Sequence, residues 1–268
     1  MREPNMQRAG DIVKGIIETG AEITGGIGGA LIGTALAGPV GLVIGGASGP
    51  IMAKMLKEFG VEIQKRIVGP REEKRIGAAY FYAIEKILQN KESGKEIRDD
   101  GFFTADDSGR SAAEEIFEGI ILKSQREYEE KKIRYFGNLM GNISFDPLVD
   151  RAYANQLIKT AEQLSYNQLC LLKIIFMSGN SKEITLRKKN YREPGTNLSR
   201  EMITVLYDII DLENRHLIIN STSHVFGITD INPGEFEVQG NGNALVTLME
   251  LKEIPDVDYG RLMALLNI

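Results

Sequence analysis

The chain has 268 residues, of which 43% are hydrophobic and 26% are charged, and its net charge is −5. These values predict a globular protein of one or two domains, without an overall attraction to nucleic acid or anionic lipid. The single cysteine, Cys170, excludes an intrachain disulfide framework and fits a reducing compartment. We interpret it as a small core residue of an apolar helix.

Residues 1–22 predict a short amphipathic helix, with Ile12, Ile16 and Ile17 on its apolar face. The helix can lie on a membrane surface or pack on the protein core. A secretory signal peptide is not expected, because acidic side chains are spread through this stretch: Glu3, Asp11, Glu18 and Glu22.

Residues 23–53 contain no charged side chain. Within them, a small residue occupies every fourth position: Gly25, Gly29, Gly33, Ala37, Gly41, Gly45 and Gly49. Residues four apart lie on one face of a helix, and small residues there let a second helix approach closely, as in membranes. The stretch therefore predicts a membrane-active, helix-packing segment. Close packing inside a soluble fold is the alternative.

Gly38 and Pro39 divide this segment, because proline and the residue before it disfavour a continuous helix. Each half forms at most ~21 Å of helix, which is shorter than the ~30 Å hydrocarbon core. The glycines of residues 24–53 cost an isolated helix roughly 10 kcal/mol relative to alanine. We therefore expect a kinked span or a hairpin with its turn at Gly38 and Pro39, stabilised by other copies or by the rest of the chain.

Basic side chains follow the uncharged segment and are expected to contact the anionic membrane surface: Lys54, Lys57, Lys65 and Arg66. Residues 54–75 hold seven basic side chains against three in residues 1–22, which predicts that the larger C-terminal part stays in the cytoplasm if the segment spans the membrane. The protein is thus expected in the cytoplasm, peripheral to or inserted in the inner membrane.

Residues 54–164 predict a helical bundle, with helices at 52–67, 71–90 and 111–139 and another that starts at Asp146-Pro147. Ser111 and Glu114 match a capping box. The acidic loop 92–109 is expected to be solvated, because its aspartates do not have the spacing of a calcium-binding loop.

Residues 165–268 predict helices at 165–177 and 199–212, strands at 216–220 and 225–228, and helices at 243–252 and 257–267. This order of elements resembles a winged-helix domain. A basic loop can contact phosphates through Arg187, Lys188, Lys189 and Arg192. The helix in the reading position exposes acidic side chains instead, so a protein partner is expected rather than nucleic acid. His216 and His224 are not expected to bind a metal.

The stretch GGIGGALIGTALAGPVGLVIGG (25–46) resembles the membrane-entering segment of α-helical pore-forming toxins. Together with a helical bundle and a winged-helix-like tail, it is similar to bacterial abortive-infection effectors. The resemblance implies a protein that oligomerises on a trigger, inserts residues 23–53 and permeabilises the inner membrane, in anti-phage defence and under the control of a regulatory protein.

The sequence therefore predicts a mainly α fold with an N-terminal Gly-rich helical hairpin, a helical bundle and a C-terminal winged-helix-like α+β domain. No enzyme signature is found, and no cofactor or metal is expected. The alternative function is a soluble adaptor or regulator that acts through the C-terminal domain.

Overall fold

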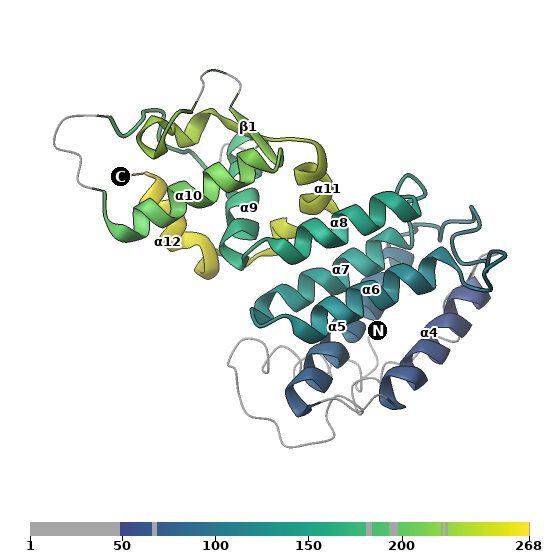
Figure 1. Cartoon of the computed structure of the whole chain (residues 1–268). Coiled ribbons are helices and arrows are strands. Elements are labelled where there is room, and N and C mark those ends of the chain that lie inside the picture. Colours follow the sequence, from purple (N-terminus) through teal and green to yellow (C-terminus); the bar gives the residue numbers. More distant parts are fainter. Residues whose placement is uncertain are drawn as a thin grey trace. The chain divides into compact units, whose positions relative to one another are not determined.

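The computed structural model of the chain describes residues 49–65, 69–180, 184–192, 198–220, 222 and 225–267, with the backbone alone over 59–65. Within these ranges the fold is mainly helical with a small two-stranded sheet, which confirms the predicted class (Figure 1). The expected helix of 1–22, the glycine row from Gly25 to Gly45 and its turn at Gly38 and Pro39 lie outside the described residues. The chain divides into two compact units, Met1–Glu162 and Gln163–Ile268.

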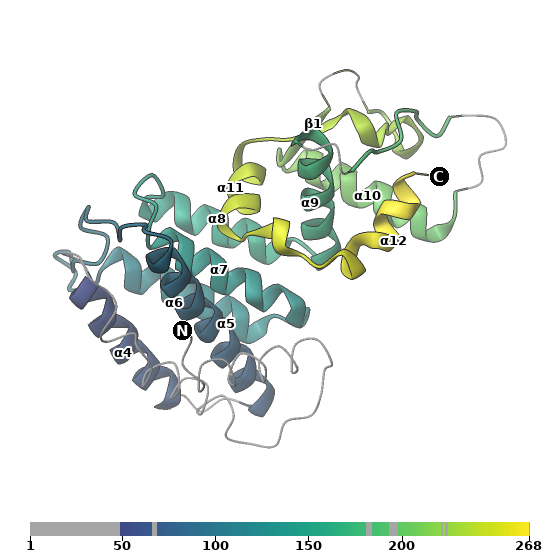
Figure 2. The same ribbon diagram turned by 180° about the vertical axis from the view of Figure 1, so that it is seen from behind.

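The first unit is helical over its described residues. Its elements are α4 (Gly49–Lys65), α5 (Pro70–Glu92), α6 (Ala112–Arg126), the 3-10 helix η1 (Glu130–Lys132), α7 (Ile133–Ile143) and α8 (Arg151–Gln163). Helix α5 is central, and it packs on both α6 and α7 (Figure 2). Its first turn is stabilised by Pro70 at the start and by a 2.8 Å bond from the Gly69 amide to Glu72 Oε2.

Helices α5 and α7 approach each other at two glycines of α7. A Cβ atom on Gly137 would lie 2.5 Å from Tyr82 Cβ and 2.8 Å from the Ala79 carbonyl oxygen. A Cβ atom on Gly141 would lie 2.6 Å from Lys86 Cβ. Real Cβ atoms do not come so close to a neighbour, so the two backbones pack at a separation that only glycine allows. Two glycines four residues apart on α7 therefore form a close helix contact within the bundle.

The predicted continuous helix over 111–139 is wrong, because the chain leaves the helix after Arg126 and η1 and α7 follow. The Glu127 carboxylate and the Lys132 ammonium lie 2.6 Å apart with side chains 6% and 2% exposed. In one helix these residues would be about 140° apart and unable to pair. The break brings these two buried charges together. Their pairing offsets the cost of burying each of them.

The helix predicted from Asp146 begins later, at Arg151. Residues 146–149 form turns, in which Asp146 Oδ1 accepts from the Leu148 amide at 3.0 Å. The Asp150 carboxylate accepts from the Tyr153 amide at 2.7 Å, so the later aspartate caps the helix.

The acidic loop after α5 is anchored rather than wholly solvated, which corrects the expectation for residues 92–109. Phe102, Phe103 and Arg98 are each 5% exposed. The Arg98 guanidinium donates to the carbonyl oxygens of Val149 at 2.8 Å and Ile143 at 3.3 Å, and it pairs with Asp100. The buried residues of the loop are Ile97, Arg98, Phe102 and Phe103, whereas residues 92–96 and 104–110 are exposed.

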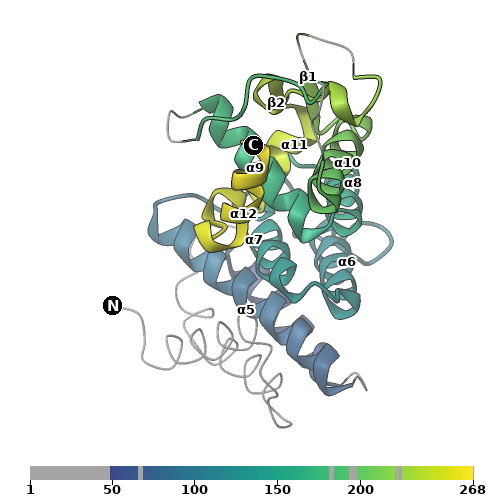
Figure 3. The ribbon, with the colours of Figure 1, turned by 90° about the vertical axis from the view of Figure 1, so that its left-hand side faces the viewer.

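The second unit surrounds α9 (Tyr166–Asn180), which packs on three other helices of the unit: α10 (Arg200–Asn214), α11 (Gly240–Leu248) and α12 (Asp256–Leu266) (Figure 3). The remaining elements are β1 (Ile218–Asn220), β2 (Phe236–Val238) and the 3-10 helices η2 (Ile228–Asp230), η3 (Pro233–Glu235) and η4 (Leu251–Glu253). Helix α9 has a continuous buried run from Gln168 to Ile175, as expected for a central helix.

The first strand is confirmed in part, but the second strand predicted at 225–228 is wrong. Strand β1 pairs antiparallel with β2, and Ile218 lies opposite Val238. The region around 225–228 lacks a buried face, because Phe226 is 86% exposed. Phe236 is 3% exposed, so β2 has the inward-facing side chain that a strand in a small sheet needs. Fifteen residues separate the two strands, including η2 and η3.

Candidate functional site

The described part of the predicted membrane segment is its end. Gly49, the last small residue of the row, is buried and is the first residue of α4. Residues 49–53 belong to the uncharged stretch and form the first turns of this helix. The last five residues of the uncharged stretch are therefore part of α4.

Helix α4 has a buried apolar face. Met52 and Leu56 are 0% exposed and Met55 is 7% exposed. The hydroxyl of Tyr80 in α5 donates to the Leu56 carbonyl oxygen at 2.6 Å, and burial of this tyrosine raises its pKa well above the ordinary value. The bond ties the middle of α4 to α5 through a neutral hydroxyl.

Two of the four predicted lipid-contacting cations can be placed. Lys54 and Lys57 are exposed on α4, and the Lys54 ammonium lies 3.8 Å from the Glu58 carboxylate. That pair is exposed on both sides, so it adds little stability and leaves the lysine in water. The Lys65 side chain and Arg66 lie outside the described residues. Among the residues that are described, no helix has the length and hydropathy needed to cross a bilayer.

The predicted phosphate-contacting loop is attached to the segment between the two strands. The Tyr191 amide donates to the Thr229 carbonyl oxygen, and the Gly234 amide donates to the Arg187 carbonyl oxygen, each at 2.8 Å. A Cβ atom on Gly234 would lie 2.9 Å from that same oxygen, so glycine permits the close contact. The loop and the 227–234 segment thus support each other.

The four cations of this loop are not equally available. The Arg187 guanidinium lies 4.7 Å from the centre of the Tyr191 ring and donates to two loop carbonyls, at 3.0 and 2.9 Å. Arg192 pairs with Asp230, and this contact lowers the pKa of the carboxyl. Lys188 and Lys189 are exposed. The structure therefore uses two of the predicted phosphate contacts to hold the loop.

The exposed side of α10 is mixed in charge. Its Glu201 carboxylate accepts from Arg261 at 2.7 Å, and Asp211 accepts from Gln168 at 2.8 Å. Tyr207, at 59% exposure, projects from the same helix. This face lacks the row of Arg, Lys, Asn or Gln side chains that base reading requires.

In the described part of the chain, no cluster of three or more His, Cys, Asp or Glu side chains has the geometry of a metal site. His216 lies at the turn after α10 with a left-handed backbone (φ 56°), and His224 is outside the described residues.

Sequence reasoning missed the buried lysines. Lys132 and Lys173 are 2% and 5% exposed. The signal for Lys173 is visible in the sequence as one cation inside the apolar run LCLLKIIF (169–176). A charge at such a position must find a partner or a polar cavity.

No protein-family model matches the chain, and no curated protein or solved structure matches it either.

Proposed function

We propose that the protein is a membrane-associated effector that oligomerises and permeabilises the bacterial inner membrane through residues 23–53. The observation that carries the proposal is the row of small residues at every fourth position within an uncharged stretch that runs from Ile23 to Ala53. Lipid tails provide no hydrophobic drive between helices, so membrane helices associate through close backbone contacts of this type. The resemblance to abortive-infection effectors places this activity, within the proposal, in anti-phage defence.

Helix α4 supports this proposal because it continues the uncharged stretch into the bundle. If residues 23–48 enter the bilayer, Lys54 and Lys57 come to lie at its surface. An anionic leaflet attracts each such lysine by about 1 kcal/mol. A single copy is a poor insertion unit, since each half of the segment is too short to span and is rich in glycine. Contacts between copies supply the missing stability, which makes oligomerisation part of the mechanism.

Dye leakage from liposomes that contain phosphatidylglycerol tests the proposal. The wild-type protein is expected to release the dye, and a Gly33→Leu/Gly41→Leu variant is expected to lose the release, because leucine blocks close helix contact. A matched control is Gly179→Leu/Gly227→Leu, since a Cβ atom at either position meets open space. The control should leak like wild type. No release by wild type, or unchanged release by the Gly33/Gly41 variant, refutes the pore.

The alternative is a soluble adaptor or regulator that acts through the second unit. It is favoured by the exposure of Tyr207 on α10, since tyrosine is enriched in protein interfaces. The resemblance of residues 165–268 to a winged-helix domain is part of this alternative. Cell fractionation separates the two functions: a protein that stays entirely soluble, even after infection of the cell, fits the adaptor alone. DNA binding by the full chain that a Lys188→Gln/Lys189→Gln variant weakens would make that adaptor a nucleic-acid binder.

A further inference from the structure

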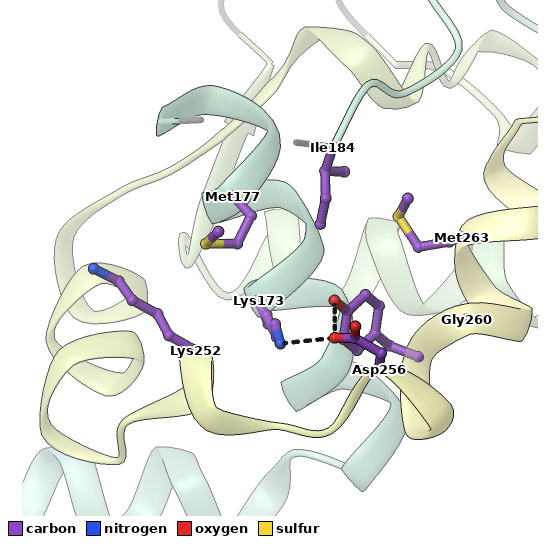
Figure 4. A pocket seen from close by; sticks show the side chains of 8 residues that line it. Lys173, Met177, Ile184, Lys252, Asp256, Gly260 and Met263 are labelled. Atoms are coloured by element: carbon purple, nitrogen blue, oxygen red, sulfur yellow. Dashed lines mark hydrogen bonds and ion pairs between the residues drawn. The ribbon is translucent and has the colours of Figure 1, made fainter. Parts of the chain in front are cut away.

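The second unit contains a cavity of about 460 Å³ between α9, η4 and α12 (Figure 4). Pockets that bind small molecules measure about 300–1,000 Å³. All the residues that line the cavity belong to the second unit, and none of them is one of the four cations of the basic loop. Its volume and its lining residues suit a small-molecule ligand, which the proposed membrane function does not require.

One side of the cavity is apolar. Met177 of α9, Met263 of α12 and Ile184 form this side (Figure 4). Methionine side chains are flexible and polarisable, so they adapt to ligands of different shape. This side therefore suits an apolar body, aliphatic or aromatic.

A buried cation lies on the opposite side. Lys173 is 5% exposed, and its ammonium donates to the Ile254 carbonyl oxygen at 2.6 Å. The ammonium lies 4.2 Å from the centre of the Tyr259 ring and 4.0 Å from Asp256 Oδ1. Burial lowers the pKa of Lys173, while the carboxylates of Asp256 and Glu253 act in the opposite direction. The lysine is held in place by a carbonyl and a ring.

The charged side chains that line the cavity are two lysines and one aspartate, and they differ in exposure. The Asp256 side chain is 93% exposed and accepts from the Tyr259 hydroxyl at 2.6 Å, so water and the phenol screen it. Lys173 is buried and is screened much less. Lys252 adds a second cation at the edge, with its ammonium 4.6 Å from the centre of the Phe176 ring.

We propose that this cavity binds a small organic anion that carries an apolar body, such as a medium-chain or aromatic carboxylate. The anionic head of the ligand pairs with the ammonium groups of Lys173 and Lys252. Its apolar body packs against Met177, Ile184 and Met263. This inference does not depend on the membrane function, and either proposal can fail alone.

Methyl NMR of the full-length protein labelled at methionine methyl groups tests the proposal, with octanoate as the probe. Octanoate is expected to shift the Met177 and Met263 signals in a saturable way at about 1–10 mM, as suits so small a ligand. The signals of buried methionines elsewhere, such as Met140 and Met202, are expected to stay in place. The octylammonium ion has the same tail and the opposite charge, and it is expected to bind at least about tenfold more weakly. Absence of shifts at Met177 and Met263, or equal shifts with both probes, overturns the proposal.

Gly260 offers a variant that fills the cavity without crowding the fold. It lines the cavity within α12, and a Cβ atom there meets no other atom within 4 Å. Replacing a helical glycine also favours the helix. Gly260→Leu is expected to weaken octanoate binding at least about tenfold, and Lys252→Gln about threefold or more. Gly179→Leu, an open position near the end of α9, is the matched control and should bind like wild type. Unchanged binding in Gly260→Leu would place the octanoate elsewhere and refute the assignment.

Discussion

Replacing Gly137 with alanine tests the close packing of α5 and α7. The new Cβ atom would lie 2.5 Å from Tyr82 Cβ and 2.8 Å from the Ala79 carbonyl oxygen. Carbon atoms in contact lie about 3.5–4.0 Å apart, so the helices must separate by about 1 Å. The blocking atoms are backbone or Cβ atoms, which no rotamer change can move, so the cost lies near the upper end of the ~1–3 kcal/mol range for overpacking. The higher helix propensity of alanine offsets about 1 kcal/mol of this cost. We expect Gly137→Ala to lower the free energy of unfolding by about 2 kcal/mol.

Urea denaturation measures this change, with the methyl NMR signal of Met140 as the probe, because that residue is fully buried in α7. At a slope of about 2 kcal/mol per molar urea, the midpoint should fall by about 1 M. Gly119→Ala in α6 is the matched control, since its new Cβ atom makes an ordinary 4.0 Å contact with Ile158 Cδ1. That control should stabilise the unit by up to about 1 kcal/mol. The reasoning is refuted if both variants have the same midpoint.

The ion pairs of Glu130 and of Glu127 in the first unit make further predictions. Burial raises the pKa of Glu130, but hydrogen bonds from Arg71 and Arg75 lower it by more, so the net shift is downward. The stability from this carboxylate is present above its ordinary pKa of about 4.3 and is lost as pH falls through the lowered value. In urea titrations at a series of pH values, wild type should therefore lose more stability on acidification than Glu130→Gln; parallel losses would contradict this. Lys132→Met leaves Glu127 buried and unpaired, and should cost about 3–5 kcal/mol by the same denaturation assay. The double variant Glu127→Leu/Lys132→Met should recover most of that loss, and a double variant as unstable as the single one would argue against a paired-charge cost.

The helices were largely predictable from the sequence because their apolar residues recur at helical spacing and their ends carry recognisable signals. Ser111 and Glu114 form the predicted capping box, with the Glu114 amide 3.1 Å from Ser111 Oγ. The break after Arg126 was missed although the spacing carries a signal, because in one continuous helix Ile133 and Phe136 would lie about 150° around the axis from Ile116 and Ile120. The decisive interaction there is the Glu127–Lys132 pair, which forms only after the chain has turned.

Features that depend on distant contacts were missed for the same reason. Strand β2 is three residues long, and its periodicity is too short to identify. The cavity beside Lys173 requires α12 to return against α9, which no local pattern of residues indicates. The basic loop was found from composition alone, but the internal use of Arg187 and Arg192 could not be.

The anchoring of the loop after α5 also gives the protein a practical attachment point. Arg98 and the two buried phenylalanines hold its base, and Ala105 and Ser111 pair across its neck. Between them, Asp107 and Ser108 form an exposed tip closed by the Gly109 amide on the Asp106 carbonyl oxygen at 2.8 Å. Chain inserted at such a tip enters and leaves at nearly the same place, so the core need not adjust. An affinity tag or a fluorescent domain placed between Asp107 and Ser108 would leave both termini unmodified, so the protein and its assemblies can be isolated from cells without altering the uncharged segment near the N-terminus.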